Sequence, residues 1–302
     1  VDIGGTAIKI GIFTDHGNLI EKFEISTDVR DFGNHILSDI FHALQAHVDF
    51  DQVKGIGFGV PGPVHHDTVL TSVNLGWTKK NVKSEFLALL GREDIIVHVS
   101  NDANVATAGE LYRGAAQGYQ NAVMFTLGTG IGGGIVVDGK IVDGLNGMAG
   151  EVGHVITDFE HGFACNCGKK GCLETVASAT GIVRLAQYRL EHHPEESSLS
   201  HVAKLSAKKV IDAAKSGDPL AIKVMEEAAN NLAYAMAFVT HIVNPGVIVL
   251  GGGVSNAGQY LIDLIEPYYY RYVRPFIEHT NFVIAKLGND AGIYGAAYMV
   301  KS

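Results

Sequence analysis

The sequence has few cysteines, few prolines and no strongly basic segment, and each shortage excludes a class of protein. Its three cysteines are an odd number and lie together within residues 165–172, which argues against a disulfide framework and for a reducing compartment. The formal charge is −9, and no basic stripe marks a nucleic-acid-binding surface. No uninterrupted apolar run reaches the roughly 18–20 residues of a membrane span, and no secretion signal opens the chain. We therefore expect a cytoplasmic protein that binds neither nucleic acid nor membrane.

Glycine, by contrast, is abundant. The 302 residues include 37 glycines against 7 prolines, with 47% apolar and 18% charged residues, an ordinary globular balance. Many glycines form short clusters between apolar runs. That placement indicates turns where the backbone approaches a ligand closely, rather than a flexible linker.

Strand and helix patterns alternate along the chain. Apolar runs predict strands at 1–3, 8–13, 18–26, 55–60, 95–99, 122–127, 133–137 and 247–250. Helical spacing predicts helices at 31–47, 81–90, 174–192, 207–216 and 218–241, while 193–200 reads as a surface loop. A strand–glycine turn–strand element occurs in each half, which indicates a duplicated α/β fold with a mainly central sheet in each domain.

We expect the division into domains to follow this duplication. An N-terminal α/β lobe is predicted over residues 1–110 and a larger C-terminal α/β lobe over 111–289. A helix at about 290–302 is expected to pack back on the first lobe.

The first candidate site is the turn at Gly4, Gly5 and Thr6 between two strands. Residues without side chains let backbone N–H groups face an anion, and Thr6 adds a hydroxyl donor. Asp2, at the end of the first strand, can hold a hydrated Mg²⁺. A plain hairpin turn is the alternative interpretation of the same residues.

Two further glycine clusters follow strands in the second half. The run from Gly128 to Gly134 includes Thr129, costs more backbone entropy than a hairpin needs, and lacks the Gly-Lys-Ser/Thr ending of a Walker loop. The run from Gly251 to Gly253 follows an apolar strand and opens a helix, which suits an adenosine or a phosphate. Each cluster is weak alone, but three of them at strand ends favour a split nucleotide site.

One histidine and three cysteines have the spacing of a closed tetrahedral Zn²⁺ site, with the ligands His154, Cys165, Cys167 and Cys172. Four protein ligands leave no position for water, so the metal is expected to be structural. Three reduced cysteines without metal are the alternative. The neighbouring Glu151 and Glu174 are not soft-metal ligands, so we interpret them as groups for sugar hydroxyls.

A polar run, Asn101 to Asn104, follows the strand at 95–99, where ligands bind in open α/β sheets. Asp102 can accept a hydroxyl proton, and Asn101 can orient the same molecule. Helix N-capping by either residue is the alternative. Beside the glycine turns and the paired glutamates, we interpret Asp102 as a catalytic base.

Together these motifs resemble the ROK family of sugar kinases and repressors, within the actin-like ATPase superfamily. The most specific element is the string Cys-x-Cys-Gly-x-x-Gly-Cys-Leu-Glu at 165–174. Residues 175–182 and 74–77 resemble bacterial glucokinases of the Gram-positive type. The resemblance implies two actin-like (ribonuclease H-like) ATPase domains with a cleft between them. It also implies ATP-dependent phosphorylation of glucose at the 6-hydroxyl, by a homodimer or homotetramer.

The resemblance further implies a role for each matched position. Asp102 would be the general base. The hexose would be held by Asn101, Glu151, His154 and Glu174, with Gly62 and Asn74 lining the same pocket. His154 would bind sugar and Zn²⁺ through different ring nitrogens. ATP with Mg²⁺ would lie among Asp2, Gly4, Gly5, Thr6, Lys9, Thr129 and Gly130, and the adenosine at Gly251, Gly252 and Gly253.

Three alternatives stay open at this point. The sugar could be fructose, mannose, N-acetylglucosamine or N-acetylmannosamine, and the donor could be polyphosphate. The chain could also be a sugar-sensing ROK repressor. We expect an enzyme, because such repressors carry an N-terminal helix-turn-helix domain and the phosphate turn here starts at residue 4.

Overall fold

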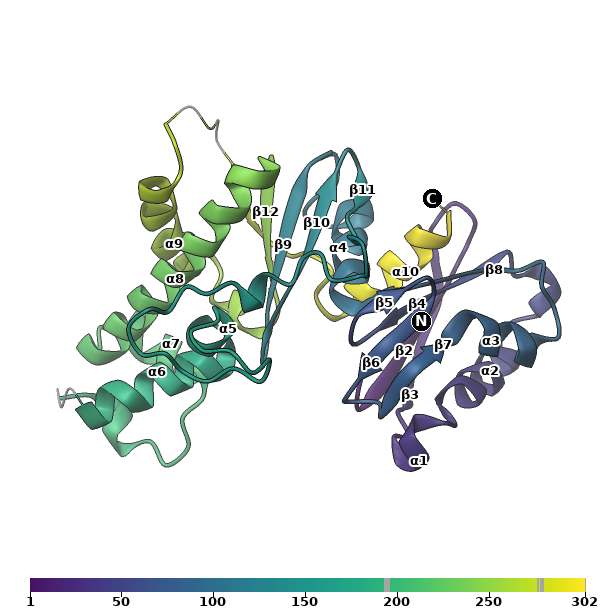
Figure 1. The fold of residues 1–302 in the computed structure, drawn as a ribbon, viewed down its shortest axis with the longest axis horizontal. Helices are drawn as coiled ribbons and strands as arrows, with labels where there is room; N and C mark the ends of the chain where they lie inside the picture. The colour runs from purple at the N-terminus through teal and green to yellow at the C-terminus, as the bar shows by residue number, and fades with distance from the viewer. Residues whose placement is uncertain (193–195, 276, 278–279, 302) are drawn as a thin grey trace. The chain divides into compact units, whose positions relative to one another are not determined.

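The computed structural model describes all residues except 193–195, 276, 278–279 and 302 (Figure 1). The chain divides into two compact units, each described by itself below. The first contains Val1–Gly118, Gly134–Gly150 and the residues from Lys286 onward, and the second contains Tyr119–Gly133 and Glu151–Ala285. No helix in the described part of the chain is long and apolar enough to cross a membrane.

The first unit is built on a five-stranded sheet with the order β3-β2-β1-β4-β8. Its strands are β1 (Asp2–Ile3), β2 (Ala7–Phe13), β3 (Leu19–Ser26), β4 (Gly55–Val60) and β8 (Ile96–Asn101). β2 is antiparallel to both β1 and β3, whereas β4 runs parallel to β1 and β8. The carboxyl ends of β1, β4 and β8 therefore meet at one edge of the sheet, where candidate residues follow each strand.

Helices cover this sheet. They are α1 (Arg30–Gly33), α2 (Ile36–His47), α3 (Val82–Leu90), α4 (Asp102–Arg113) and α10 (Ala291–Lys301), with short 3₁₀ turns η1 (Phe50–Gln52) and η5 (Gly288–Asp290). Buried side chains of α2 and α3 share one apolar core with the strands. The helix α10 packs on α4 and β4 at such close range that a Cβ on Gly57, Gly109 or Gly295 would overlap the opposing backbone. The C-terminal helix belongs to the first unit.

Two parts of the first unit differ from the sequence-based expectation. The helix predicted over 31–47 begins at Ile36, because Asp31 and Phe32 have left-handed backbone angles, with φ of 50° and 53°. A small antiparallel sheet of β5 (Val64–His65), β6 (Thr68–Ser72) and β7 (Trp77–Asn81) was not predicted at all. The buried Trp77 indole joins these two regions, because it donates a hydrogen bond to the Gly33 carbonyl at 3.0 Å.

The second sheet has the order β11-β10-β9-β12-β13. Its strands are β9 (Ala122–Leu127), β10 (Ile131–Val137), β11 (Lys140–Ile141), β12 (Val247–Gly251) and β13 (Asn281–Ile284). The helices of the second unit are α5 (Glu174–Ala177), α6 (Ala179–His192), α7 (Ala207–Lys215), α8 (Pro219–Val243) and α9 (Gln259–Tyr272). Short 3₁₀ turns occur at η2 (Val152–His154), η3 (Ser198–His201) and η4 (Gly253–Ala257).

The single helix predicted over 174–192 is broken at Ser178. This residue has an extended backbone, with ψ of 172°, and its hydroxyl donates to the Glu174 carbonyl at 2.7 Å. The same hydroxyl accepts the N–H of Gly181 at 2.9 Å, so one buried side chain ends α5 and caps α6. The loop predicted over 193–200 lies partly outside the described residues and ends in η3.

The boundary between the units differs from the one predicted from the sequence, which divides the chain once, after residue 110. That division places residues 111–118 and 134–150 in the second lobe, whereas the structure groups them with the first unit. The later segment returns to α4, where the Asn104 amide donates to Asp143 at 3.0 Å. The fully buried carboxylate of Glu110 accepts the backbone N–H groups of Ala115, Lys286 and Leu287 at 2.6, 3.1 and 2.8 Å. One side chain thus anchors two chain segments that lead to the second unit.

Candidate functional site

The turn between β1 and β2 is tightly closed. The Gly4 N–H donates to the Ala7 carbonyl at 3.0 Å, and a Cβ on Gly4 would lie 2.8 Å from that oxygen. The hydroxyl of Thr27 donates to the Gly4 carbonyl at 2.7 Å, and its N–H donates to the Thr6 carbonyl at 3.0 Å. Thr27, the residue that follows β3, therefore holds both ends of the turn through their carbonyl oxygens.

Two charged side chains lie at the base of this turn. Asp2 and Lys9 are register partners across β1 and β2. Burial raises the pKa of Asp2, and the positive charge of Lys9 partly opposes that rise. A cation such as Mg²⁺ would offset the cost of ionising this carboxylate, so Asp2 fits a metal–phosphate site. Lys9 extends to the Asn289 carbonyl, to which its ammonium donates at 2.9 Å.

The end of β8 brings three predicted residues together. Asn101 is the N-cap of α4, since its side-chain oxygen accepts the N–H of Ala103 at 2.9 Å. Its amide group donates to the Gly62 carbonyl at 3.0 Å. Gly62 has φ of 109°, and a Cβ there would overlap the backbone of Thr71, so only glycine fits. Because Asn101 caps the helix, Asp102 occupies its first position with an exposed carboxylate, where the helix dipole favours a negative charge.

Asn74 lies next to the first glycine turn. A Cβ on Gly5 would touch the Asn74 Cβ at 3.4 Å, so the loop between β6 and β7 approaches the turn between β1 and β2. Asn74 itself is exposed, while the adjacent Leu75 is fully buried and anchors the loop. The exposed amide is therefore held in place by a buried neighbour.

In the second unit, the two predicted glycine clusters are neighbours. Strands β9 and β12 are parallel, with Gly251 paired to Thr126. Gly252 has φ of 81°, and a Cβ there would overlap the backbone of Leu127, immediately before the turn at Gly128–Gly130. Gly253 begins the 3₁₀ turn η4, not the α-helix that was expected to open there. The turns proposed for phosphate and for adenosine thus lie side by side in one unit.

The four predicted metal ligands converge. The Nδ1 or Nε2 atom of His154 and the sulfurs of Cys165, Cys167 and Cys172 all lie within 4.8 Å of one another. The Cys167 and Cys172 sulfurs are 3.6 Å apart, and Cys165 Sγ is 3.6 Å from His154 Nδ1. A tetrahedral Zn²⁺, bound at about 2.3 Å from sulfur and about 2.0–2.1 Å from nitrogen, separates its ligand atoms by roughly 3.5–3.8 Å. The donor set and its spacing therefore fit Zn²⁺.

The environments of the three thiols differ. Burial raises the pKa of the Cys172 thiol to about 12, and it also raises the pKa of Cys165. At the exposed Cys167, a hydrogen bond from the Lys169 N–H lowers the pKa. Two buried thiols resist ionisation unless a cation compensates their charge, as a bound metal does.

Two carboxylates, those of Glu151 and Glu174, lie beside the cluster. Glu151 precedes His154 in η2, and its Oε2 lies 3.8 Å from His154 Nε2. Since Nδ1 faces the sulfurs, Nε2 is the ring nitrogen on the carboxylate side. Glu174 Oε2 accepts the N–H of Ile131 at 3.1 Å, and its Oε1 lies 3.8 Å from Cys165 Sγ. Within the second unit, Glu151 and Glu174 therefore lie beside the candidate metal cluster, of which His154 is a member.

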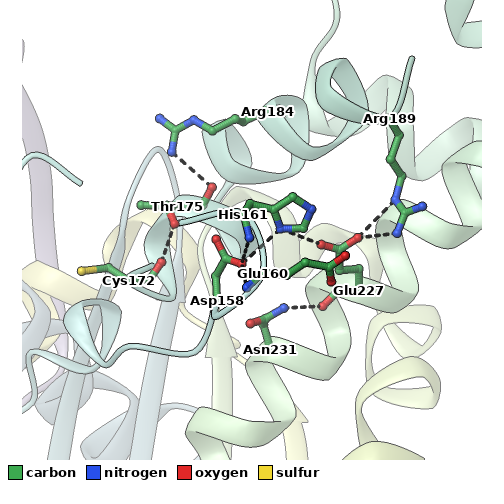
Figure 2. A network of polar contacts seen from close by, with 9 residues as sticks. All are labelled: Asp158, Glu160, His161, Cys172, Thr175, Arg184, Arg189, Glu227 and Asn231. Carbon is green, nitrogen blue, oxygen red and sulfur yellow. Dashed lines mark hydrogen bonds and ion pairs between the residues drawn. The ribbon is translucent and has the colours of Figure 1, made fainter. Parts of the chain in front are cut away.

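A polar network fastens the segment between His154 and Cys165 to α8 (Figure 2). His161 Nδ1 lies 3.1 Å from Asp158 and 3.4 Å from Glu227, and Arg189 of α6 pairs with Glu227 at 2.6 Å. Burial opposes ionisation of Asp158, but hydrogen bonds from the backbone and ring of His161 hold its pKa below the ordinary value. This network was not predicted, because its members come from three separate elements.

Sequence reasoning also missed Thr180, whose hydroxyl donates to the Thr129 carbonyl at 2.8 Å. Residues 175–182 carry part of the family resemblance, but the spacing of their side chains does not indicate that Thr180 contacts a residue 51 positions away. A contact of this kind is visible only in the folded chain.

The sequence model of the ROK family matches residues 1–302. The chain belongs to the ROK family. It is 42% identical to the glucokinase of Halalkalibacterium halodurans, over 100% of this chain and 94% of that protein. It is 34% identical to the glucokinase of Thermotoga maritima, over 100% of this chain and 96% of that protein.

Among solved structures, the chain is similar to a ROK family glucokinase from Streptomyces griseus in complex with glucose and AMPPNP. The TM-score is 0.77 at 33% identity, covering 99% of this chain and 97% of the other. The family inferred from the cysteine motif and the α/β class inferred from the alternating elements are both confirmed.

Proposed function

We propose that this ROK protein transfers the γ-phosphoryl group of ATP to the C6 hydroxyl of glucose. The observation that carries the proposal is the full-length identity of 42% to a glucokinase. The likeness to a ROK glucokinase in complex with glucose and the ATP analogue AMPPNP supports both substrates. The cysteine thiols, none of them in a disulfide, are consistent with a cytoplasmic enzyme.

In this proposal Asp102 accepts the proton of the sugar hydroxyl as it attacks phosphorus. Its support is an exposed carboxylate at the end of a parallel strand, with the helix-capping role taken by Asn101. We assign sugar binding to Asn101, Gly62 and Asn74 of the first unit. In the second unit we assign it to Glu151, His154 and Glu174.

Phosphoryl transfer depends mainly on alignment and on neutralising charge, because the protein makes no covalent bond to the phosphoryl group. We assign the phosphates to Gly4, Gly5, Thr6 and Lys9 and to Thr129 and Gly130, with the adenosine at Gly251–Gly253. Mg²⁺ bound with ATP supplies neutralising charge, and Asp2 would hold its hydration shell. Zn²⁺ would be held by His154, Cys165, Cys167 and Cys172, and it would fix the segment that carries the sugar-binding carboxylates.

The substrate assignment is tested by measuring ADP release with ATP and, in turn, glucose, fructose, mannose, N-acetylglucosamine and N-acetylmannosamine. The highest kcat/KM is expected for glucose. A clear preference for an N-acetyl sugar would overturn the glucokinase assignment. An equal rate with polyphosphate in place of ATP would overturn the assignment of ATP as the phosphoryl donor.

We further propose that the chain forms a homodimer or homotetramer through one face of α8. Tyr234, Phe238 and Ile242 recur every four residues on that face and are 38%, 51% and 69% exposed. The Tyr234 ring lies 6.4 Å from that of Phe159 and 5.3 Å from that of Tyr272, which are 77% and 38% exposed. If each large side chain is given about 200 Å² when fully exposed, these five side chains together expose roughly 500 Å². That area is over half of the roughly 800 Å² that one partner contributes to a standard interface.

The assembly surface is tested by the mass of the protein in solution. Phe238→Lys and Ile242→Lys should each lower that mass to the monomer, because a lysine ammonium is costly to bury, while helix formation is preserved. Ile20→Lys is a matched control, since Ile20 is 65% exposed on β3 of the first unit. A monomeric wild type, or variants that keep the wild-type mass, would contradict the proposed surface.

A further inference from the structure

The turn between β9 and β10, residues Gly128–Ile131, is supported by the segment that follows Cys172 in the chain. The Ala179 N–H donates to the Gly128 carbonyl at 2.8 Å. The Thr180 hydroxyl donates to the Thr129 carbonyl at 2.8 Å. Two successive carbonyl groups of the turn are therefore held by two successive residues at the start of α6.

A third bond reaches the turn from Glu174, whose Oε2 accepts the Ile131 N–H at 3.1 Å. The same carboxylate lies so close to Gly130 that a Cβ there would overlap it. The backbone of Gly153, next to the metal ligand His154, is packed so closely on Ile131 that a Cβ would overlap its carbonyl oxygen. The turn is thus enclosed by residues adjacent to metal ligands.

The supporting segment, residues Glu174–Thr180, is internally rigid. It starts two residues after the ligand Cys172, whose carbonyl accepts both the N–H and the hydroxyl of Thr175 at 2.8 and 2.7 Å. Ser178 is fully buried, and its hydroxyl joins the Glu174 carbonyl, the Gly181 N–H and the Thr180 hydroxyl. A displacement at Cys172 is therefore transmitted along fixed hydrogen bonds to Thr180.

We infer that residues Glu174–Thr180 position the Gly128–Ile131 turn for the ATP phosphates, so that the metal cluster supports nucleotide binding as well as sugar binding. The bonds from Ala179 and Thr180 use carbonyl oxygens. The N–H groups of Thr129 and Gly130 are therefore not consumed by this support and can face an anion. Thr180 is a positioning residue. The assignment of the turn to ATP rests on the proposed function, whereas the mechanical coupling does not.

The experiment combines hydrogen exchange with nucleotide titration on the full-length protein. Amide exchange at residues 129–132 is measured without sugar or nucleotide, in Zn²⁺-loaded protein, after chelation, and in loaded Thr180→Val and Thr180→Ser. ATP affinity is then measured by calorimetry on the same samples. Thr180→Ser is the matched control because it keeps the hydroxyl that donates to Thr129.

Chelation and Thr180→Val should both speed exchange of these amides several-fold. Thr180→Val should weaken ATP binding by about two- to tenfold, the effect of losing one hydrogen bond, and Thr180→Ser should restore it. Exchange at 129–132 that is unchanged by both chelation and Thr180→Val would overturn the coupling. Faster exchange with unchanged ATP affinity would overturn the nucleotide role. Absent glucose kinase activity would refute the proposed function while leaving the exchange result to decide the coupling.

Discussion

Replacement of Asp102 by asparagine separates the chemical role of this residue from its structural one. The substitution removes the charge and keeps the shape of the side chain. If the carboxylate is the general base, kcat should fall on the order of 10²–10⁴-fold. The fold should persist, because Asn101 caps α4 and Asp102 is exposed. Asp102 Oδ1 also accepts the Ala103 N–H at 2.8 Å, a bond that the asparagine oxygen can keep. The lost charge costs its favourable interaction with the helix dipole, about 0.3–1 kcal/mol.

The assay is ADP release at saturating glucose and ATP, together with glucose affinity by calorimetry and the free energy of unfolding in urea. Asp39→Asn is a matched control, because Asp39 also lies in the first turn of a helix of the first unit. The control should lose a similar small amount of stability and keep full activity. Near-normal kcat in Asp102→Asn would refute the base assignment. Loss of glucose binding together with turnover would instead show that Asp102 binds the sugar.

Three further outcomes are expected. Cys167→Ala should lose Zn²⁺ and bind glucose more weakly, as measured by metal analysis and calorimetry. Because the Cys167 side chain is exposed, the substitution opens no cavity in the core, so the loss of metal would be the cause. Wild-type protein that contains no zinc after purification would contradict this prediction. Glu110→Ala should cost about 3 kcal/mol or more in urea unfolding, because three N–H groups lose their acceptor, and an unchanged midpoint would refute the anchor. The pKa of Asp158 is held below 3.8, so its carboxylate stabilises the fold above that pH, and this contribution is lost as the pH falls through the lowered folded value. The stability deficit of Asp158→Asn should therefore be present at about pH 5 and narrow below about pH 4, and a deficit that grows as the pH falls from about 4 would contradict the sign.

Local spacing was sufficient for some features and insufficient for others. The candidate metal cluster could be predicted because three of its members lie within eight residues of the chain. The glycines among these residues allow tight turns, and such turns bring the three sulfur atoms together. The glycine turns could be predicted because each directly follows an apolar strand. The start of α2 and the break at Ser178 could not, because helical spacing of apolar residues continues through both. The short strands β5 to β7 also lack the long apolar runs that mark central strands.

The sequence alone was enough to identify the family and the α/β class, and it supplied the candidate metal ligands and the candidate base. Each of these depends on residue types at short spacings, which the covalent chain enforces. Only the tertiary structure decided that Asn101 rather than Asp102 caps α4 and that residues 134–150 return to the first unit. It also decided that Glu174 and Thr180 hold the turn of residues 128–131. These are hydrogen bonds between residues up to 51 positions apart, and their partners are chosen by the packing of whole elements.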